Sequence, residues 1–162
     1  MARIYISIGS NINPTENVQQ AVKVLREHFS DVAVSPVYES EAVGFEGSNF
    51  LNLVVAANTE LDVYETNKLL HEIEDNYGRD RSGPRFSSRT IDLDLLLYDD
   101  LIIKEAGLEI PREEILQNAF VLWPLADVAA ETKHPQLGQT IAELWQAFDK
   151  QSQKLWPIEL EF

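Results

Sequence analysis

The chain contains no cysteine and few positive charges, and these two shortages exclude several classes of function. Without cysteine there can be no disulfide bond, thiolate metal site or cysteine nucleophile. Only 13 lysines and arginines stand against 27 aspartates and glutamates, which gives a formal charge of −14 at pH 7. Such a protein repels the phosphate backbone of nucleic acid and the surface of anionic lipid. We therefore expect small-molecule partners, with no nucleic acid and no membrane.

Long hydrophobic runs are also missing. No stretch approaches the roughly 18 apolar residues of a membrane span, and no basic segment followed by an apolar run begins the chain. The sequence has 162 residues, 44% of them apolar, and it shows neither a repeat nor a break in composition. It therefore predicts one domain over residues 1–162. We expect this domain to be a cytoplasmic monomer.

Several familiar catalytic motifs do not occur. The chain lacks the Gly-x-x-x-x-Gly-Lys-Ser/Thr phosphate loop, the Gly-x-Gly-x-x-Gly dinucleotide motif and the Gly-x-Ser-x-Gly elbow of serine hydrolases. Its histidines, His28, His71 and His134, are far apart and lack the paired spacing of zinc sites, so we expect them at the surface or packed on helices. Walker-type, dinucleotide-binding and serine-hydrolase chemistry are all disfavoured.

Hydrophobic periodicity predicts four strands and three helices. The strands are expected at residues 3–8, 32–38, 51–57 and 90–98, and the helices at residues 14–30, 61–77 and 138–148. The first six elements follow the order β-α-β-β-α-β, which is that of the ferredoxin-like split unit. We therefore predict an α+β fold, a ferredoxin-like α/β sandwich whose first two helices cover one face of a mostly antiparallel sheet.

Two aspartates interrupt the last predicted strand. In Ile91-Asp92-Leu93-Asp94-Leu95 the strand period of two places both carboxylates on one face and the apolar side chains on the other. Carboxylates about 6.6 Å apart along a strand can both reach divalent cations, and paired cations about 3.5 to 4 Å apart serve phosphoryl chemistry. We favour Mg²⁺ bound by Asp92 and Asp94. The alternative is an exposed strand face with two solvated aspartates.

Four of the seven arginines fall within the segment just before these aspartates. Guanidinium groups on a loop that contains Gly83-Pro84 can bind phosphate oxygens bidentately, which together with a metal indicates a metal–polyphosphate substrate. The alternative is a surface network of ion pairs with nearby acidic residues. The arginines are Arg79, Arg81, Arg85 and Arg89, and the acidic residues are Glu72, Glu74, Asp75 and Asp80.

Two phenylalanines lie beside asparagines, Phe50 at an expected loop–strand boundary and Phe120 in an expected irregular segment. Aromatic faces can stack on a flat heterocycle, and the amide of Asn52 can read the polar rim of that heterocycle. These three residues are therefore candidates for binding a planar nitrogenous substrate. Packing in the core is the alternative for each phenylalanine.

These segments together resemble the 6-hydroxymethyl-7,8-dihydropterin pyrophosphokinase family of folate biosynthesis, almost from end to end. The resemblance implies a ferredoxin-like sandwich that transfers the β,γ-diphosphate of ATP to the pterin hydroxymethyl group and releases AMP, with two Mg²⁺ ions. Its most specific segment is Arg89-Thr-Ile-Asp-Leu-Asp-Leu95. The others are Tyr5-Ile-Ser-Ile-Gly-Ser-Asn11, Ser35-Pro-Val-Tyr-Glu-Ser40, Val43-Gly44, Asn49-Phe-Leu-Asn52, Ile73-Glu74, Gly78-Arg79 and Phe120-Val-Leu-Trp-Pro-Leu125.

The resemblance implies a role for individual positions. It implies that Asp92 and Asp94 bind the metal ions and that these two aspartates act in catalysis together with Arg79 and Arg89. The residues implied in ATP binding are Arg79, Arg81, Arg89 and Arg112, and those implied in pterin binding are Ser40, Val43, Phe50, Asn52, Phe86 and Phe120.

Three positions depart from the family pattern. Phe86 replaces the usual tryptophan, Arg112 the usual histidine and Asn118 the usual arginine. Arg112 still carries a positive charge, but Asn118 cannot neutralise a phosphate and loses a charge-assisted hydrogen bond worth roughly 1.5 to 3 kcal/mol. The alternative function is a weak or inactive pterin- or nucleotide-binding module of the same fold. A third possibility is an acidic protein-interaction domain.

Overall fold

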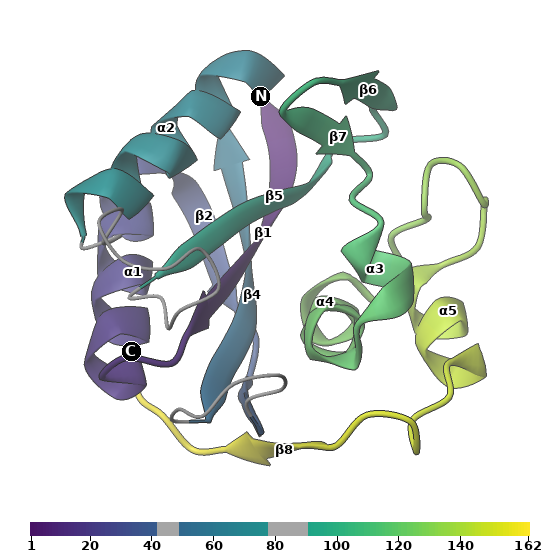
Figure 1. The fold of residues 1–162 in the computed structure, drawn as a ribbon. Helices are drawn as coiled ribbons and strands as arrows, with labels where there is room; N and C mark the ends of the chain where they lie inside the picture. The colour runs from purple at the N-terminus through teal and green to yellow at the C-terminus, as the bar shows by residue number, and fades with distance from the viewer. Residues whose placement is uncertain (42–48, 78–90) are drawn as a thin grey trace.

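The computed structural model describes residues 1–41, 49–77 and 91–162. Their main sheet has six strands in the order β5-β1-β4-β3-β8, with β2 also paired to β4, and every pairing is antiparallel (Figure 1). The strands are β1 (Ala2–Ser10), β2 (Ser30–Val34), β3 (Val37–Ser40), β4 (Phe50–Thr59), β5 (Asp92–Tyr98) and β8 (Leu155–Ile158).

Helices lie on both faces of this sheet (Figure 1). One face carries α1 (Pro14–His28) and α2 (Val63–Asn76), and the other carries α3 (Glu114–Gln117), α4 (Ala119–Ala129) and α5 (Ile141–Ala147). A small hairpin of β6 (Ile103–Glu105) and β7 (Leu108–Ile110) follows β5. The predicted ferredoxin-like α+β fold is confirmed, whereas the division of the second predicted strand into β2 and β3 and the helical cover of the second face were not foreseen. Within the described ranges, no helix is both long and apolar enough to cross a membrane.

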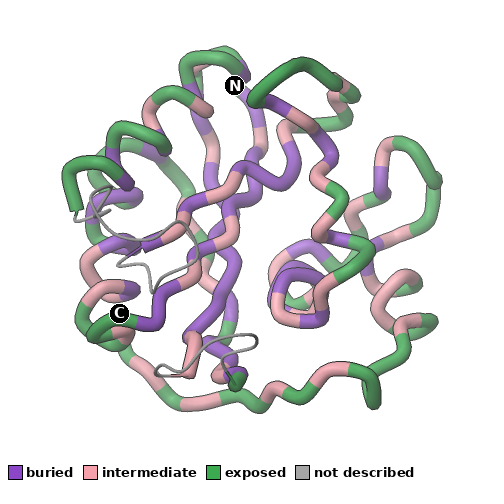
Figure 2. The backbone as a smooth tube through the Cα atoms, in the orientation of Figure 1, coloured by how far each residue is buried: buried purple, intermediate pink, exposed green. Residues whose placement is uncertain are grey.

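The sheet separates two hydrophobic cores because its side chains alternate between the faces. Ile4, Ile6 and Ile8 of β1 pack with α1 and α2, as their alternation predicts. Tyr5 of β1 instead joins the core under α4, which also contains Val54 of β4. Strand β4 is buried along nearly its whole length, and the central strands form the buried interior in Figure 2.

The helix boundaries follow from capping residues. Helix α2 begins at Val63 rather than at the expected residue 61, because Asp62 accepts a hydrogen bond from the N–H of Glu65 at 2.8 Å and closes a capping box. Helix α5 begins at Ile141 rather than at residue 138 for the same reason, with Thr140 as its cap. Helix α1 ends at His28, two residues earlier than expected.

The single strand predicted over residues 32–38 is wrong, since the chain forms β2 and β3 with a break at Ser35 and Pro36. Proline has no N–H to donate to a sheet, so the ladder cannot continue through it. At the break, the hydroxyl of Ser35 takes the place of a backbone acceptor and accepts a hydrogen bond from the N–H of Val54 at 2.9 Å. The two strands therefore remain attached to β4 on either side of the break.

Strand β5 starts at Asp92, two residues after the predicted start, and contains a β-bulge. Ile6 of β1 pairs with Leu95, but Tyr5 pairs with Leu97, which leaves Leu96 as the extra residue. Leu95 therefore packs with α1 and α2, while Leu96 and Leu97 both belong to the core under α4. Up to the bulge, successive side chains of β5 point to opposite faces of the sheet, and at the bulge this alternation stops.

His134 is buried in the turn before α5, and not at the surface. Its Nδ1 accepts hydrogen bonds from the N–H groups of Gln136 at 3.2 Å and Leu137 at 3.3 Å. Protonation of Nδ1 would break both bonds. Burial accordingly lowers the pKa of His134 below its ordinary value of 6.5.

We expect this histidine to make the protein less stable in mild acid. Below pH 6.5 the unfolded chain takes up a proton that folded His134 resists, so stability present above this pH is lost as the pH falls toward the lower folded pKa. The free energy of unfolding in urea should drop further between pH 7.5 and 5.5 in the wild type than in His134→Asn. Asparagine keeps an acceptor but does not titrate. An equal drop in His134→Asn would contradict the assignment.

Candidate active site

A cavity of about 950 Å³ opens on the face of the sheet that carries α4. Its floor is formed by residues of β1, β4 and β5, and its walls come from the chain around α3 and α4 and from the C-terminal segment 151–154. The floor includes Ser7, Gly9, Asn52, Asp92, Asp94 and Leu96, and the walls include Ser40, Phe50, Arg112, Glu114, Asn118 and Phe120.

The cavity brings together every predicted site residue that the structure describes. These seven residues come from β3, β4, β5, the chain before α3, and α4. They are Ser40, Phe50, Asn52, Asp92, Asp94, Arg112 and Phe120. The other five predicted residues, Val43, Arg79, Arg81, Phe86 and Arg89, lie outside the described ranges. Their roles remain predictions.

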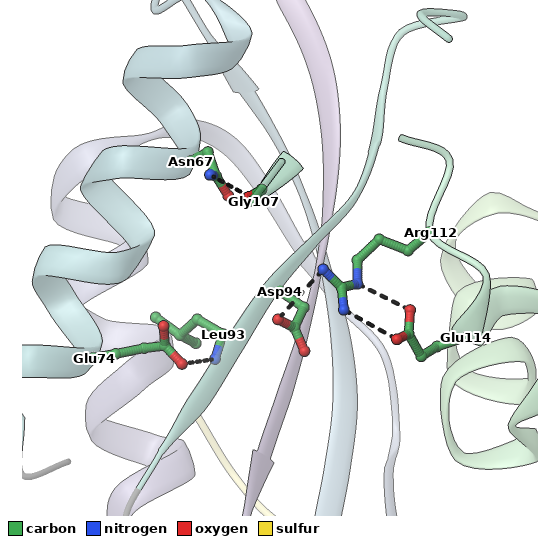
Figure 3. Close-up of polar contacts among 7 residues, drawn as sticks. All are labelled: Asn67, Glu74, Leu93, Asp94, Gly107, Arg112 and Glu114. Atoms are coloured by element: carbon green, nitrogen blue, oxygen red, sulfur yellow. Dashed lines mark hydrogen bonds and ion pairs between the residues drawn. The ribbon is translucent and has the colours of Figure 1, made fainter. Parts of the chain in front are cut away.

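Asp92 and Asp94 lie on the cavity side of β5, with Leu93 between them on the opposite side. Figure 3 shows Glu74 reaching from α2 to the Leu93 backbone, where its carboxylate accepts a hydrogen bond from the N–H at 3.1 Å. Asp94 points the other way, and its Oδ1 lies 3.9 Å from Nη1 of Arg112. The aspartates therefore face a shared cavity.

Arg112 is held by two hydrogen bonds to Glu114, from Nε and Nη2 to the two carboxylate oxygens, both at 3.0 Å (Figure 3). Burial is the largest single influence and raises the pKa of Glu114, but the hydrogen bonds from Arg112, a hydrogen bond from its own backbone and the positive charge of Arg112 together lower that pKa below its ordinary value. The charge of Arg112 is thus shared between Glu114 and Asp94. Glu114 was not among the predicted site residues, since its role depends on how the chain turns between β7 and α3.

Gly9 lies directly opposite Asn52 on one side and Asp92 on the other in the strand pairing. A Cβ atom on Gly9 would lie 2.8 Å from Oδ1 of Asn52, so the absent side chain leaves room for the buried Asn52 amide. The importance of Gly9 was missed. A glycine within a strand is the signal that could have found it, because such a glycine often marks a close approach of another group.

The two phenylalanines come from different walls. Phe50 is the first residue of β4, as expected, whereas Phe120 lies in the first turn of α4 and not in an irregular segment. Both are half-buried, and both line the cavity. Phe120 also packs against the core under α4, so its core contact and its place in the cavity coexist.

Comparison with known proteins identifies this arrangement. A protein-family model described as 7,8-dihydro-6-hydroxymethylpterin-pyrophosphokinase (HPPK) matches residues 5–130. The chain belongs to the HPPK family. The resemblance inferred from the sequence motifs is therefore confirmed. Residues after 130, which include α5 and β8, lie beyond the match.

Individual proteins of the HPPK family are also similar to this chain. The chain is 37% identical over 133 residues to the 2-amino-4-hydroxy-6-hydroxymethyldihydropteridine pyrophosphokinase of Bacillus subtilis, covering 80% of this chain and 79% of that protein. The enzyme of the same name from Pseudomonas aeruginosa is 36% identical over 147 residues, covering 88% and 89%. A crystal structure of wild-type Plasmodium falciparum HPPK-DHPS with SDX-DHP matches with a TM-score of 0.70 at 15% identity. That match covers 90% of this chain but only 43% of the other, and it supports the fold alone.

The cavity suits the divalent metal expected for an HPPK. The described residues contain no group of three or more histidine, cysteine, aspartate or glutamate side chains placed to hold a metal ion. Mg²⁺ does not require one, since it commonly binds through one or two carboxylates together with waters and substrate phosphates. Asp92 and Asp94, on one side of β5 and lining one cavity, match this donor set.

Two of the three departures from the HPPK pattern lie in the cavity wall. Arg112 keeps a positive charge there, but Glu114 already binds its guanidinium. Asn118 places an uncharged amide where the family pattern has an arginine. Phe86, the third departure, lies outside the described residues. The described wall is therefore less positive than the family pattern implies.

Proposed function

We propose that the protein transfers the diphosphate of ATP to the hydroxymethyl group of 6-hydroxymethyl-7,8-dihydropterin, giving AMP and the pterin diphosphate in folate synthesis. One observation carries the proposal: in a member of the HPPK family, a single cavity combines two strand carboxylates with two aromatic side chains and a buried amide. The carboxylates suit a metal–polyphosphate, and the aromatic and amide groups suit a flat heterocycle.

The pterin would bind between the walls that carry Phe50 and Phe120. Their rings offer faces on which the pterin can stack, and the Asn52 amide offers both a donor and an acceptor to its polar rim. Ser40 lines the same region because it pairs with Phe50 in the sheet. Val43 and Phe86 complete the pterin set that we propose.

The phosphate groups would bind on the side of Asp92 and Asp94, which we propose hold two Mg²⁺ ions. When bound, Mg²⁺ supplies charge neutralisation and favours deprotonation of the pterin hydroxyl. We assign Arg79, Arg81 and Arg89 to the phosphates, with Arg79 and Arg89 in catalysis. Arg112 would reach the phosphates from its place beside Asp94, while Glu114 keeps its guanidinium oriented.

The reaction needs no protein nucleophile. The pterin hydroxymethyl oxygen forms a bond to the β-phosphorus of ATP as the bond between that phosphorus and the AMP oxygen breaks, and the hydroxyl proton is released. The protein contributes by holding the two substrates in line and by neutralising charge on the transferred diphosphate.

The proposal is tested by mixing the purified protein with Mg-ATP and the reduced pterin alcohol and separating the nucleotides. We expect AMP and pterin diphosphate to form in equal amounts. Release of ADP, or no pterin-dependent AMP, would overturn the proposed reaction.

A second candidate is a pterin- or nucleotide-binding module with weak or no catalysis. Asn118 in the cavity wall and the engagement of Arg112 by Glu114 favour it, because both reduce the positive charge available to phosphates. Calorimetry separates the two functions. Tight binding of pterin or nucleotide without AMP formation at high protein concentration would establish the binding module, whereas stoichiometric AMP would exclude it.

A further inference from the structure

The C-terminal segment 151–154 forms one side of the cavity although it lies beyond the residues that match the HPPK family. The side chain of Gln153 fixes this segment to the junction between α3 and α4. Its Oε1 accepts a hydrogen bond from the N–H of Ala119 at 2.8 Å, and its Nε2 donates one to the carbonyl of Gln117 at 2.8 Å. One side chain thus binds both peptide groups that flank Asn118.

These two peptide groups belong to helix ends. Gln117 is the last residue of α3, so its carbonyl has no partner within that helix. Ala119 is the first residue of α4, so its N–H has no partner within that helix. Asn118 is the N-cap of α4, and asparagine is a favoured capping residue, yet its side chain makes no capping hydrogen bond. Gln153 stabilises the junction from outside, and the Asn118 side chain lines the cavity instead.

The same short segment is fixed at a second point, two residues later. Leu155 begins β8 and pairs with Ser40 of β3, and Ser40 in turn pairs with Phe50 of β4. Residues 153–155 therefore connect the wall that carries Phe50 to the first turn of α4, which carries Phe120. Further along α4, a separate contact to β3 is made by Asp127, which accepts a hydrogen bond from the Tyr38 hydroxyl at 2.5 Å.

We propose that Gln153 is a positioning residue that sets the separation between Phe50 and Phe120, and hence the width of the slot for the pterin ring. The inference rests on the proposed function, because it takes the ligand between these rings to be a pterin. A slot between two aromatic rings is sensitive to its width, since dispersion contacts weaken steeply with small gaps. Loss of the two Gln153 hydrogen bonds frees the first turn of α4, while Tyr38 and Asp127 still hold the rest of that helix.

The test compares Gln153→Ala with the wild type and with Gln146→Ala, an exposed glutamine of α5 whose side chain makes no hydrogen bond in the described structure. We expect the Kd for 6-hydroxymethylpterin, measured by calorimetry with a non-hydrolysable ATP analogue and Mg²⁺, to rise about tenfold in Gln153→Ala. The KM for ATP should stay within about twofold of the wild type, and Gln146→Ala should match the wild type in both. Hydrogen exchange at the Ala119 amide should become faster in Gln153→Ala and stay unchanged in Gln146→Ala.

A second variant, Gln153→Met, keeps the volume of the side chain and removes only its hydrogen bonds, so it should reproduce the loss of pterin affinity. Pterin binding within twofold of the wild type in both variants, or an equal weakening for pterin and ATP, would overturn the inference. So would a wild-type protein that binds no pterin. If the wild type binds pterin but forms no AMP, the proposed reaction fails while the binding comparison still decides the role of Gln153.

Discussion

Replacement of Asp94 with alanine is expected to reduce pterin-dependent AMP formation by on the order of a thousandfold. The carboxylate lies on the cavity side of β5, where the loss of a metal ligand would remove several kcal/mol of charge stabilisation in the transition state. The fold should survive, because the Asp94 side chain is 44% exposed and Arg112 keeps its two hydrogen bonds to Glu114. Product formation over time, at saturating Mg-ATP and pterin, is the measurement.

Two further variants make this result specific. Asp94→Asn keeps the shape of the side chain and removes its charge, so it should lose activity nearly as severely as the alanine variant. Asp100→Ala removes an exposed aspartate from the turn after β5 and should leave AMP formation unchanged. Undiminished AMP production by Asp94→Ala would refute the assignment of Asp94 as a metal ligand.

The substitution Gly9→Ala is expected to weaken pterin binding roughly 10- to 100-fold. The new methyl group would lie 2.8 Å from Oδ1 of Asn52, and the buried amide would have to move away from its place beside Gly9. The hydrogen bonds that we propose this amide makes to the pterin, worth about 1 to 3 kcal/mol, would be lost or distorted. Calorimetric titration with 6-hydroxymethylpterin in the presence of Mg²⁺ and a non-hydrolysable ATP analogue measures the effect.

Gly107→Ala provides the contrast for this prediction. Gly107 lies between β6 and β7 with a φ of 82°, and an added Cβ there would meet no atom within 4 Å. That variant should lose about 1 kcal/mol of stability through backbone strain and bind pterin normally. The opposite pattern, with pterin affinity intact in Gly9→Ala, would show that the Asn52 amide does not bind the substrate.

The sequence was most informative where alternation is regular. The period of two predicted that Leu93 and Leu95 pack together while Asp92 and Asp94 face the other way, and the structure confirms this for the described strand. The same pattern identified β1 from its three isoleucines. In both strands one face is apolar and the other is mixed, so the local sequence is enough to predict which side chains face the core with α1 and α2.

Other parts of the site depend on contacts between distant residues. Helix α4 was missed because its sequence is apolar almost throughout and contains Pro124, which hides the helical period. The closeness of Gly9 to Asn52 requires the register between β1 and β4. The place of Gln153 in the cavity wall requires the pairing of β8 with β3, which joins segments more than a hundred residues apart. No local pattern encodes these neighbours.

The hydrogen bond between Glu74 and the Leu93 N–H has a consequence for self-association. Among the described residues, β5 is the outermost strand on one side of the main sheet. The outward N–H groups of an edge strand are in general a template on which a second chain can add a strand. The Glu74 carboxylate accepts a hydrogen bond from one of these donors, the N–H of Leu93 at the second residue of β5. In a chain of net charge −14, another copy approaching this edge would meet both a blocked donor and like charge, which disfavours aggregation through added strands.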